Sequence, residues 1–364
     1  MQRIPLSNGT SIPSIGCGCA FGNWTGGTAF QGFLPEQAYR STALALQAGL
    51  RHFDGAHVYS TERAVGSVIG RNFADGVLTR DDVFLTTKLC HPAAPPHFAS
   101  SHLRSWNMRD VASIEQVGGY GCRVTRFGVW GLGFGVWGLG FVVWGLGFRV
   151  WDCDAVHFEQ RVRDDFARSL DDLGVGYVDL LLMHWPGSFD EKDCAFARRC
   201  RTVVWSTFES FLKLGTARAI GVCNFSATHL QQLLDDGAAV VPMVNQVELH
   251  PYCQDPDLEA FCTAQRIVLQ AYAPFASGAF GLLSDPVIAA IAAHHRKNTG
   301  QVILRWHLQL GRVVLPKSSS AERISSNLDV FDFELTQQEM QAITALQPQG
   351  TAPRRTCPDP ATIV

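Results

Sequence analysis

The stretch of residues 178–186, VDLLLMHWP, is the feature that most restricts the folds open to this chain. Its apolar residues are consecutive rather than alternating, and a proline ends the run. Such a run is typical of a strand buried on both faces, as in a parallel sheet covered by helices. His184 falls where this strand passes into a loop, which is where an eight-stranded α/β barrel carries its functional residues.

Similar short apolar runs alternate with helical patterns along the rest of the chain. The Asn8–Gly9 pair between two short apolar runs predicts an N-terminal β-hairpin. We therefore predict an α/β fold, a (β/α)8 TIM barrel preceded by this hairpin, as a single domain over residues 1–364. The expected strands are 14–18, 50–54, 83–88, 178–184, 219–222, 243–247, 267–271 and 313–316. The expected helices are 35–48, 61–69, 157–173, 202–214, one after Ser226, 286–295, 300–310 and 336–345.

Residues 93–154 do not fit the barrel pattern. A strand–helix–strand unit needs roughly 30 residues, yet Lys88 and His184 are 184 − 88 = 96 positions apart. The excess contains the heptapeptide GVWGLGF twice, from 128 and from 135, and VVWGLGF from 142. Its glycines, each costing a helix about 1 kcal/mol, argue against a membrane span. We predict a low-complexity insertion between the third and fourth strands without a catalytic role. Translated repetitive DNA and retained non-coding sequence both stay open as its origin.

Charge and cysteine usage exclude several classes of function. A net charge of −3 gives no electrostatic basis for binding nucleic acid or an anionic membrane. The 11 cysteines include no CxxC pair, so the sequence predicts neither a zinc site nor a disulfide framework. Residues 1–16 have no basic segment followed by a long apolar core, which argues against a secretory signal. We expect a cytoplasmic monomer without a bound metal.

Four residues with chemical potential fall at three successive expected strand ends: Asp54, Tyr59 five residues later, Lys88 and His184. Taken alone, each of these four residues would more often have a structural role than a catalytic one. Together, the segments FDGAHVY at 53–59, TTKL at 86–89 and LMHWP at 182–186 resemble the signature segments of the aldo-keto reductases. The segments at 215–226, 244–251 and 315–323 resemble that family's later motifs. The resemblance implies an NADPH-dependent oxidoreductase that reduces a carbonyl to an alcohol.

The chemistry of these side chains agrees with that activity. Carbonyl reduction needs a hydride on carbon and a proton on oxygen, and Tyr59 is the candidate proton donor. A phenol titrates near pH ~10, and a neighbouring Lys88 ammonium would lower its pKa. Asp54 would hold Lys88 charged and oriented. His184 would bind the substrate oxygen and stabilise charge developing on it.

The cofactor NADP(H) follows from the resemblance, since no GxGxxG motif is present. Two cations and a hydroxyl around a phosphate favour NADPH over NADH. The matched cofactor positions are Asn224 and Gln246 for the carboxamide, Tyr272 for stacking, Phe275 and Ser277 for the pyrophosphate, Lys317, Ser318 and Arg323 for the 2′-phosphate, and Asn327 for adenine.

Substrate contacts are expected from His184, Trp185 and Trp24. Trp24 is considered because Ala20 stands where many family members carry a tryptophan. The loop after Pro186 looks short, which favours a small aldehyde or ketone. The alternative hypothesis is a catalytically impaired protein of this fold that binds NADPH as a binding or structural module. A metal-dependent barrel hydrolase would need a His-x-His at an early strand end, and this sequence has none there.

Overall fold

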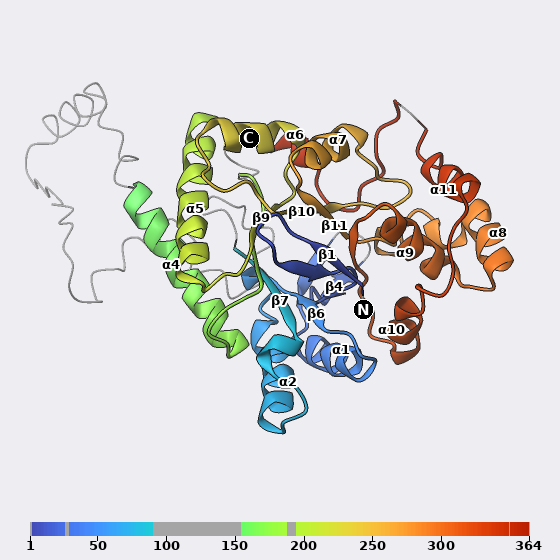
Figure 1. The fold of residues 1–364 in the computed structure, drawn as a ribbon, viewed down its shortest axis with the longest axis horizontal. Coiled ribbons are helices and arrows are strands. Elements are labelled where there is room, and N and C mark those ends of the chain that lie inside the picture. The colour runs from blue at the N-terminus through green and yellow to red at the C-terminus, as the bar shows by residue number, and fades with distance from the viewer. Residues whose placement is uncertain (1, 26–28, 90–153, 188–193, 349, 364) are drawn as a thin grey trace, which may run out of the picture.

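The computed structural model describes residues 2–25, 29–89, 154–187, 194–348 and 350–363, with the backbone alone for 23–25, 29–31 and 154–157 (Figure 1). The predicted insertion 93–154 lies outside the described residues except for Asp154, which begins a helix. Its structure and role therefore stay a prediction.

A parallel sheet of eight strands forms the centre of the molecule (Figure 1). In spatial order its strands are β12 (Val313–Leu315), β11 (Val268–Tyr272), β10 (Val244–Glu248), β9 (Ile220–Cys223), β8 (Leu180–Met183), β7 (Phe84–Leu89), β6 (His52–Asp54) and β3 (Cys17–Gly18). The two edges meet through a parallel bridge between Ile15 and Val314, where the Val314 amide donates to the Ser14 carbonyl at 2.9 Å. The sheet is thus closed, and the predicted barrel is confirmed.

Helices surround the barrel, and most follow the predicted ranges. They are α1 (Pro35–Gln47), α2 (Glu62–Ala74), α4 (Asp154–Leu173), α5 (Cys194–Leu214), α6 (Ala227–Asp235), α7 (Pro256–Ala264), α8 (Pro286–His295), α9 (Thr299–Gln309), α10 (Ala321–Leu328) and α11 (Gln337–Thr344). The sequence did not predict α7 and α10, which span 9 and 8 residues. Helix α5 also begins eight residues earlier than expected, at Cys194.

Strand β8, within the apolar run 178–186, is buried on both faces. Leu181 and Met183 pack outward into the layer between strands and helices, and Leu180 and Leu182 pack into the barrel interior. All four side chains are fully buried. Burial of one such side chain contributes about 1.5–3 kcal/mol, so the residues on both faces of this strand stabilise the barrel.

The N-terminal hairpin covers one end of the barrel. Strands β1 (Arg3–Pro5) and β2 (Ser11–Pro13) pair antiparallel across a turn in which Gly9 has φ 83°, as the Asn8–Gly9 pair predicted. Leu6 and Ile12 of this hairpin join the interior cluster. That cluster also contains residues from the amino ends of several strands, so the carboxyl ends form the opposite rim.

A second hairpin, which the sequence did not predict, follows β3 at the carboxyl rim. Strand β4 (Gly22–Thr25) pairs antiparallel with β5 (Ala29–Phe33), with an irregularity in register between Asn23 and Trp24. Phe33 at its end lies against the ring of Tyr59, with centroids 5.1 Å apart. This hairpin therefore forms part of the wall around the candidate site.

Candidate active site

Successive parallel strands bring Asp54, Lys88 and His184 to one edge of the barrel. Asp54 ends β6 and Lys88 lies near the end of β7, while His184 directly follows β8. In the register of these strands Asp54 pairs with Thr86, and Lys88 pairs with Leu182. Tyr59 ends the short 3-10 helix η1 (His57–Tyr59) that continues from β6.

Lys88 and Asp54 form a buried ion pair. The Lys88 Nζ donates to Asp54 Oδ2 at 2.7 Å and to the Gly55 carbonyl at 2.9 Å, and its side chain is fully buried. The second carboxylate oxygen, Oδ1, accepts from Gln246 Nε2 at 2.7 Å. A buried charge pair is stable only when its remaining donors and acceptors are satisfied, and these contacts supply that satisfaction. The predicted pairing of Asp54 with Lys88 is thus present in the structure.

Tyr59 and His184 form the second pair at this edge. The Tyr59 hydroxyl lies 3.3 Å from His184 Nε2, and the two rings are nearly perpendicular, at 82°. The Lys88 Nζ is 5.0 Å from the centre of the Tyr59 ring. We call Asp54, Tyr59, Lys88, His184 and Gln246 the inner cluster.

Burial dominates the electrostatics of the inner cluster. It raises the pKa of Tyr59 above the usual value, and the nearby Lys88 ammonium only partly opposes this shift. From the sequence we expect a net lowering of the Tyr59 pKa. The direction of the Lys88 effect was right, but the outcome was wrong because desolvation of the phenolate outweighs it. Burial and Lys88 together lower the pKa of His184 well below its usual value, so this imidazole is neutral at pH 7.

Lys88 and Asp54 each stabilise the charged form of the other. Burial lowers the pKa of Lys88. The charge and hydrogen bond of Asp54, with contributions from Tyr59 and Cys223, together outweigh burial, so the net pKa is raised. Burial raises the pKa of Asp54, and Lys88 and Gln246 oppose that rise. Lys88 therefore keeps its ammonium charge next to the Tyr59 ring.

Two of the predicted carboxamide and stacking residues lie next to the inner cluster. Asn224 follows β9 in the left-handed conformation, at φ 61°, which asparagine tolerates better than most residues. Its Nδ2 donates to the His184 carbonyl at 3.0 Å, and its Oδ1 accepts from the Tyr272 hydroxyl at 2.8 Å. The structure thus brings Asn224, Gln246 and Tyr272 to the same edge as the four predicted catalytic residues.

The predicted phosphate residues form a separate group on the connection from β12 to α10. Arg323 Nε donates to Ser318 Oγ at 3.2 Å, and Lys317 Nζ donates to the Ala20 carbonyl at 2.9 Å. Lys317 and Arg323 are exposed, and neither pairs with an acidic side chain among the described residues. We call Lys317, Ser318 and Arg323 the outer cluster. Two uncompensated cations beside a hydroxyl fit a phosphate group.

The remaining predicted contacts lie around these two clusters. Phe275 and Ser277 follow β11, and the exposed Ser277 has φ 52°. Asn327 is buried one turn beyond Arg323 on α10. Trp185, directly after His184, is 5% exposed. Trp24 lies on β4, but its side chain is outside what the structure describes.

Sequence reasoning missed the attachment of the C-terminal tail to this rim. The buried Glu248 at the end of β10 accepts from the Thr356 amide at 2.7 Å and from its hydroxyl at 2.6 Å. Its other oxygen accepts from the Cys357 amide at 3.0 Å. Burial raises the pKa of Tyr272, and the nearby Cys357 and Glu248 contribute to that rise. The only signal in the sequence was the acidic residue Glu248, directly after the expected strand 243–247.

The fold and these contacts define an α/β barrel with a buried Asp–Lys pair and a Tyr–His pair at the carboxyl ends of its strands. A model of the aldo/keto reductase family matches residues 19–116 and 154–348. An aldo-keto reductase of Mycolicibacterium smegmatis is 34% identical over 363 residues, covering 99% of this chain and 97% of that protein. The glyoxal reductase of Bacillus subtilis is 45% identical over 181 residues, covering 50% of this chain and 61% of that protein.

Solved structures give the same result. The aldo-keto reductase MGS-M4 from a deep-sea metagenome library has a TM-score of 0.68 at 28% identity, covering 98% of both chains. A Bombyx mori aldo-keto reductase in complex with NADP has a TM-score of 0.68 at 27% identity, covering 95% of this chain and 92% of that one. This chain belongs to the aldo/keto reductase family, whose members are oxidoreductases.

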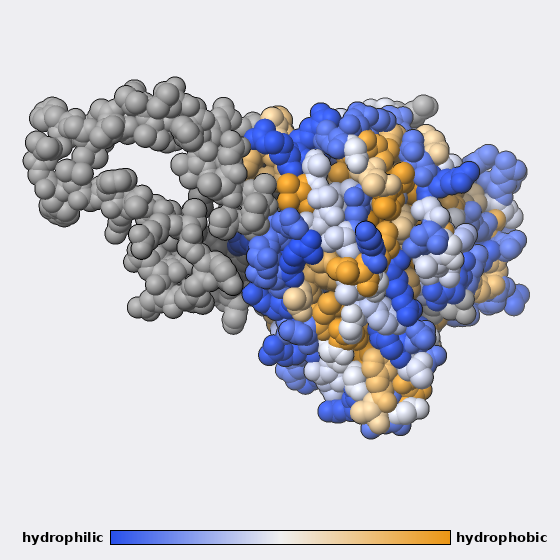
Figure 2. All heavy atoms as spheres, turned by 60° about the vertical axis from the view of Figure 1, so that its left-hand side comes forward, coloured by the Kyte–Doolittle hydropathy of each residue, from blue (hydrophilic) through white to orange (hydrophobic). Residues whose placement is uncertain are grey.

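Within the described residues, no helix is both long enough and apolar enough to cross a membrane. On the face shown in Figure 2, hydrophilic side chains are interspersed with smaller apolar areas.

Proposed function

We propose that this protein is an NADPH-dependent reductase that converts a small aldehyde or ketone to an alcohol, with Tyr59 as the proton donor. The observation that carries the proposal is the placement of the buried Lys88 ammonium, held by Asp54, 5.0 Å from the Tyr59 ring whose hydroxyl reaches His184. The complex of the Bombyx mori relative with NADP supports the choice of cofactor. The name of the Bacillus subtilis glyoxal reductase supports a small aldehyde.

Three side chains of the inner cluster, Tyr59, Lys88 and His184, act next to the reacting atoms. When bound, NADPH supplies the hydride for the carbonyl carbon. Tyr59 gives its hydroxyl proton to the carbonyl oxygen, and the resulting phenolate lies next to the Lys88 ammonium. Because burial keeps the pKa of Tyr59 high, the phenol retains its proton at neutral pH and is in the state that donates. The neutral His184 can donate an Nε2 hydrogen bond to the same oxygen and orient it.

Asp54 and the outer cluster act away from the reacting atoms. Asp54 keeps Lys88 charged and fixes its position through the 2.7 Å contact. Lys317, Ser318 and Arg323 would bind the 2′-phosphate through charge-assisted hydrogen bonds. Asn224 and Gln246 would hold the carboxamide, and Tyr272 would stack on the nicotinamide ring.

The test is NADPH oxidation in the presence of a small aromatic aldehyde, followed by the loss of NADPH absorbance. Tyr59→Phe should lower the turnover number by about 10²–10⁴-fold, the usual contribution of a positioned acid. Tyr39→Phe on α1 is the matched control and should leave turnover unchanged. If neither the native chain nor the control turns over while NADPH still quenches tryptophan fluorescence, the protein is a binding module and the proposed mechanism is wrong.

We also propose that residues 1–364 form one barrel domain and that the insertion 93–154 has no part in catalysis. The family model leaves residues 117–153 unmatched, which supports an insertion in that part of the chain, but it matches residues 93–116. A chain lacking residues 93–153 should retain turnover. Activity that depends on the insertion would overturn this proposal and leave the assignment of Tyr59 intact.

A further inference from the structure

Three metal-ligating side chains meet between α8 and α11, outside both clusters described above. His294 and His295 end α8, and Glu339 lies in the first turn of α11. His294 Nδ1 lies 2.9 Å from Glu339 Oε1, and His295 Nε2 lies 3.0 Å from both carboxylate oxygens. One donor atom from each residue lies within 4.8 Å of the other two.

The donor set suits a transition-metal ion better than a hard cation. Two imidazoles and one carboxylate are ligands that Zn²⁺ binds in protein sites with an open fourth position, whereas Mg²⁺ and Ca²⁺ favour oxygen donors alone. Zinc–ligand bonds of about 2.0–2.2 Å place tetrahedral donors about 3.3 Å apart. The nitrogen–oxygen separations of 2.9 and 3.0 Å are close to that value. The two imidazole nitrogens lie within 4.8 Å of each other. The side chain of His294 is 69% exposed, which leaves its ring room to turn toward an ion.

Hydrogen bonds from Thr336 hold the Glu339 carboxylate in place next to the two histidines. Glu339 Oε2 accepts from the Thr336 amide at 2.7 Å and from the Thr336 hydroxyl at 2.9 Å, which forms the capping box of α11. Partners of this kind orient metal-binding carboxylates in known sites.

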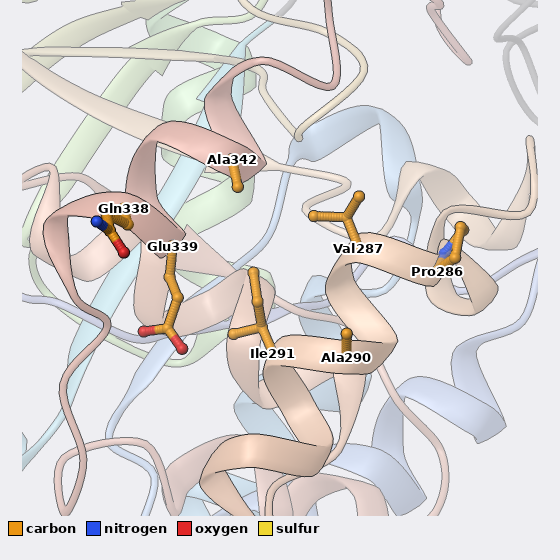
Figure 3. A pocket seen from close by; sticks show the side chains of 7 residues that line it. All are labelled: Pro286, Val287, Ala290, Ile291, Gln338, Glu339 and Ala342. Atoms are coloured by element: carbon orange, nitrogen blue, oxygen red, sulfur yellow. The ribbon is translucent and has the colours of Figure 1, made fainter.

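The charges around Glu339 also favour an ion at this position. Glu339 borders an apolar groove of about 500 Å³ between the two helices, together with Ile291 and Ala342, and the two histidines lie outside the lining of that groove (Figure 3). Lys297, two residues after His295, pairs with Asp329 and Asp332 at 2.7 Å each. Among the described residues, only His294 and His295 are within ion-pair distance of Glu339.

We propose that His294, His295 and Glu339 form a binding site for one Zn²⁺-like transition-metal ion, which joins α11 to α8. In the ion-free protein the ring nitrogens facing Glu339 carry the proton, because a carboxylate oxygen can only accept. On metal binding that proton moves to the other ring nitrogen, so that a lone pair faces the ion, and water fills the fourth position. The ion would hold the last helix against the barrel and is separate from carbonyl reduction.

The test uses the full chain after treatment with a chelator and Co²⁺ as a spectroscopic probe. One equivalent of Co²⁺ should produce the strong visible absorption of a tetrahedral site, and Zn²⁺ should displace it. Zn²⁺ in excess should also raise the thermal midpoint by about 2 °C or more, since it binds only the folded state. A weak spectrum like that of the aqueous ion at all protein concentrations would overturn the proposal.

Variants identify the ligands. Glu339→Gln retains a capping residue for α11 while removing the charge, and His295→Gln removes one nitrogen donor. Each should weaken Co²⁺ binding by at least about 100-fold, with an unchanged circular dichroism spectrum. Gln341→Ala, an exposed change on the same helix, is the matched control and should bind as the native chain does. If the absorption persists in Glu339→Gln, the ion binds elsewhere on the chain and the assignment is wrong.

Discussion

The inner and outer clusters lie on the same barrel but are built in opposite ways. In the inner cluster, the charges of Asp54 and Lys88 are buried and paired at 2.7 Å. In the outer cluster, Lys317 and Arg323 are exposed, and among the described residues no acidic side chain pairs with them. The comparison indicates that the groups proposed to react are fixed before any ligand arrives, whereas the groups proposed to bind phosphate are left for the ligand to complete.

The largest effect is expected from removing the buried ammonium. Lys88→Met leaves the Asp54 carboxylate buried and unpaired, which should lower the free energy of unfolding by about 3–5 kcal/mol. It also removes the charge next to the proposed Tyr59 phenolate, so turnover should fall below detection. Urea unfolding and the NADPH assay measure the two effects.

A double variant that combines Asp54→Asn with Lys88→Met separates stability from chemistry. It removes both charges, while the introduced carboxamide can still accept from Gln246, so most of the lost stability should return. Turnover should not return, because the ammonium is still absent. Recovery of activity would show that Lys88 has only a structural role and that the inner cluster is not organised around its charge.

Acid should destabilise the buried interior and not the exposed outer cluster. Burial lowers the pKa of His184 well below its usual value, of His229 to about 4, and of His52 and His307 to about 3. Each is neutral when folded but protonates near pH ~6.5 when unfolded. The stability they contribute is complete above that pH and is lost as the pH falls toward the folded pKa values.

The slope of unfolding free energy against pH measures this effect. Each histidine contributes about 1.4 kcal/mol per pH unit inside the window. Urea unfolding between about pH 7 and about pH 5 should therefore show a falling stability, and His307→Gln should reduce the slope by about one proton. A profile that is flat across this range would show that these imidazoles are not held neutral.

A smaller effect, confined to the cofactor, is expected in the outer cluster. Arg323→Ala should raise the KM for NADPH by about 10–100-fold, the value of one hydrogen bond to a charged group. Turnover at saturation and the KM for NADH should not change, because only NADPH carries the 2′-phosphate. Added KCl should raise the KM for NADPH further in the native chain, since exposed charges are screened.

Arg71→Ala, an exposed arginine on α2, is the matched control for that measurement and should leave the NADPH preference unchanged. A parallel rise in the KM for both cofactors on mutation of Arg323 would contradict the phosphate assignment.

The smallest effect is expected at the C-terminal tail, where Glu248 connects a buried strand end to residues 356–357. Glu248→Gln should weaken the hydrogen bonds to Thr356 and Cys357, at a cost of about 1–3 kcal/mol. Burial raises the pKa of the Cys357 thiol to about 11, so the native thiol should react slowly with a disulfide reagent. The variant should react faster, while the exposed Cys194 serves as an internal reference. Unchanged labelling of Cys357 would show that the tail is held by other contacts.

Local sequence patterns predicted much of this molecule. The apolar run at 178–186, the Asn8–Gly9 turn and the alternation of short strands with helices predicted a barrel with its hairpin, and both are present. The order of Asp54, Lys88 and His184 on successive strands predicted that they would meet. Parallel strands bring their carboxyl ends to one edge, so a position in the chain becomes a position in space.

Only the tertiary structure decided the features that depend on contacts distant in sequence. The net rise of the Tyr59 pKa follows from burial by surrounding elements, which no local pattern encodes. The hydrogen bonds between Glu248 and residues 356–357 connect segments that are 108 positions apart. The meeting of His294, His295 and Glu339 depends on the packing of α11 against α8, and the sequence, assessed by its cysteines, predicted no metal. Periodicity is a property of neighbouring residues, whereas desolvation and the assembly of ligands are properties of the packed chain.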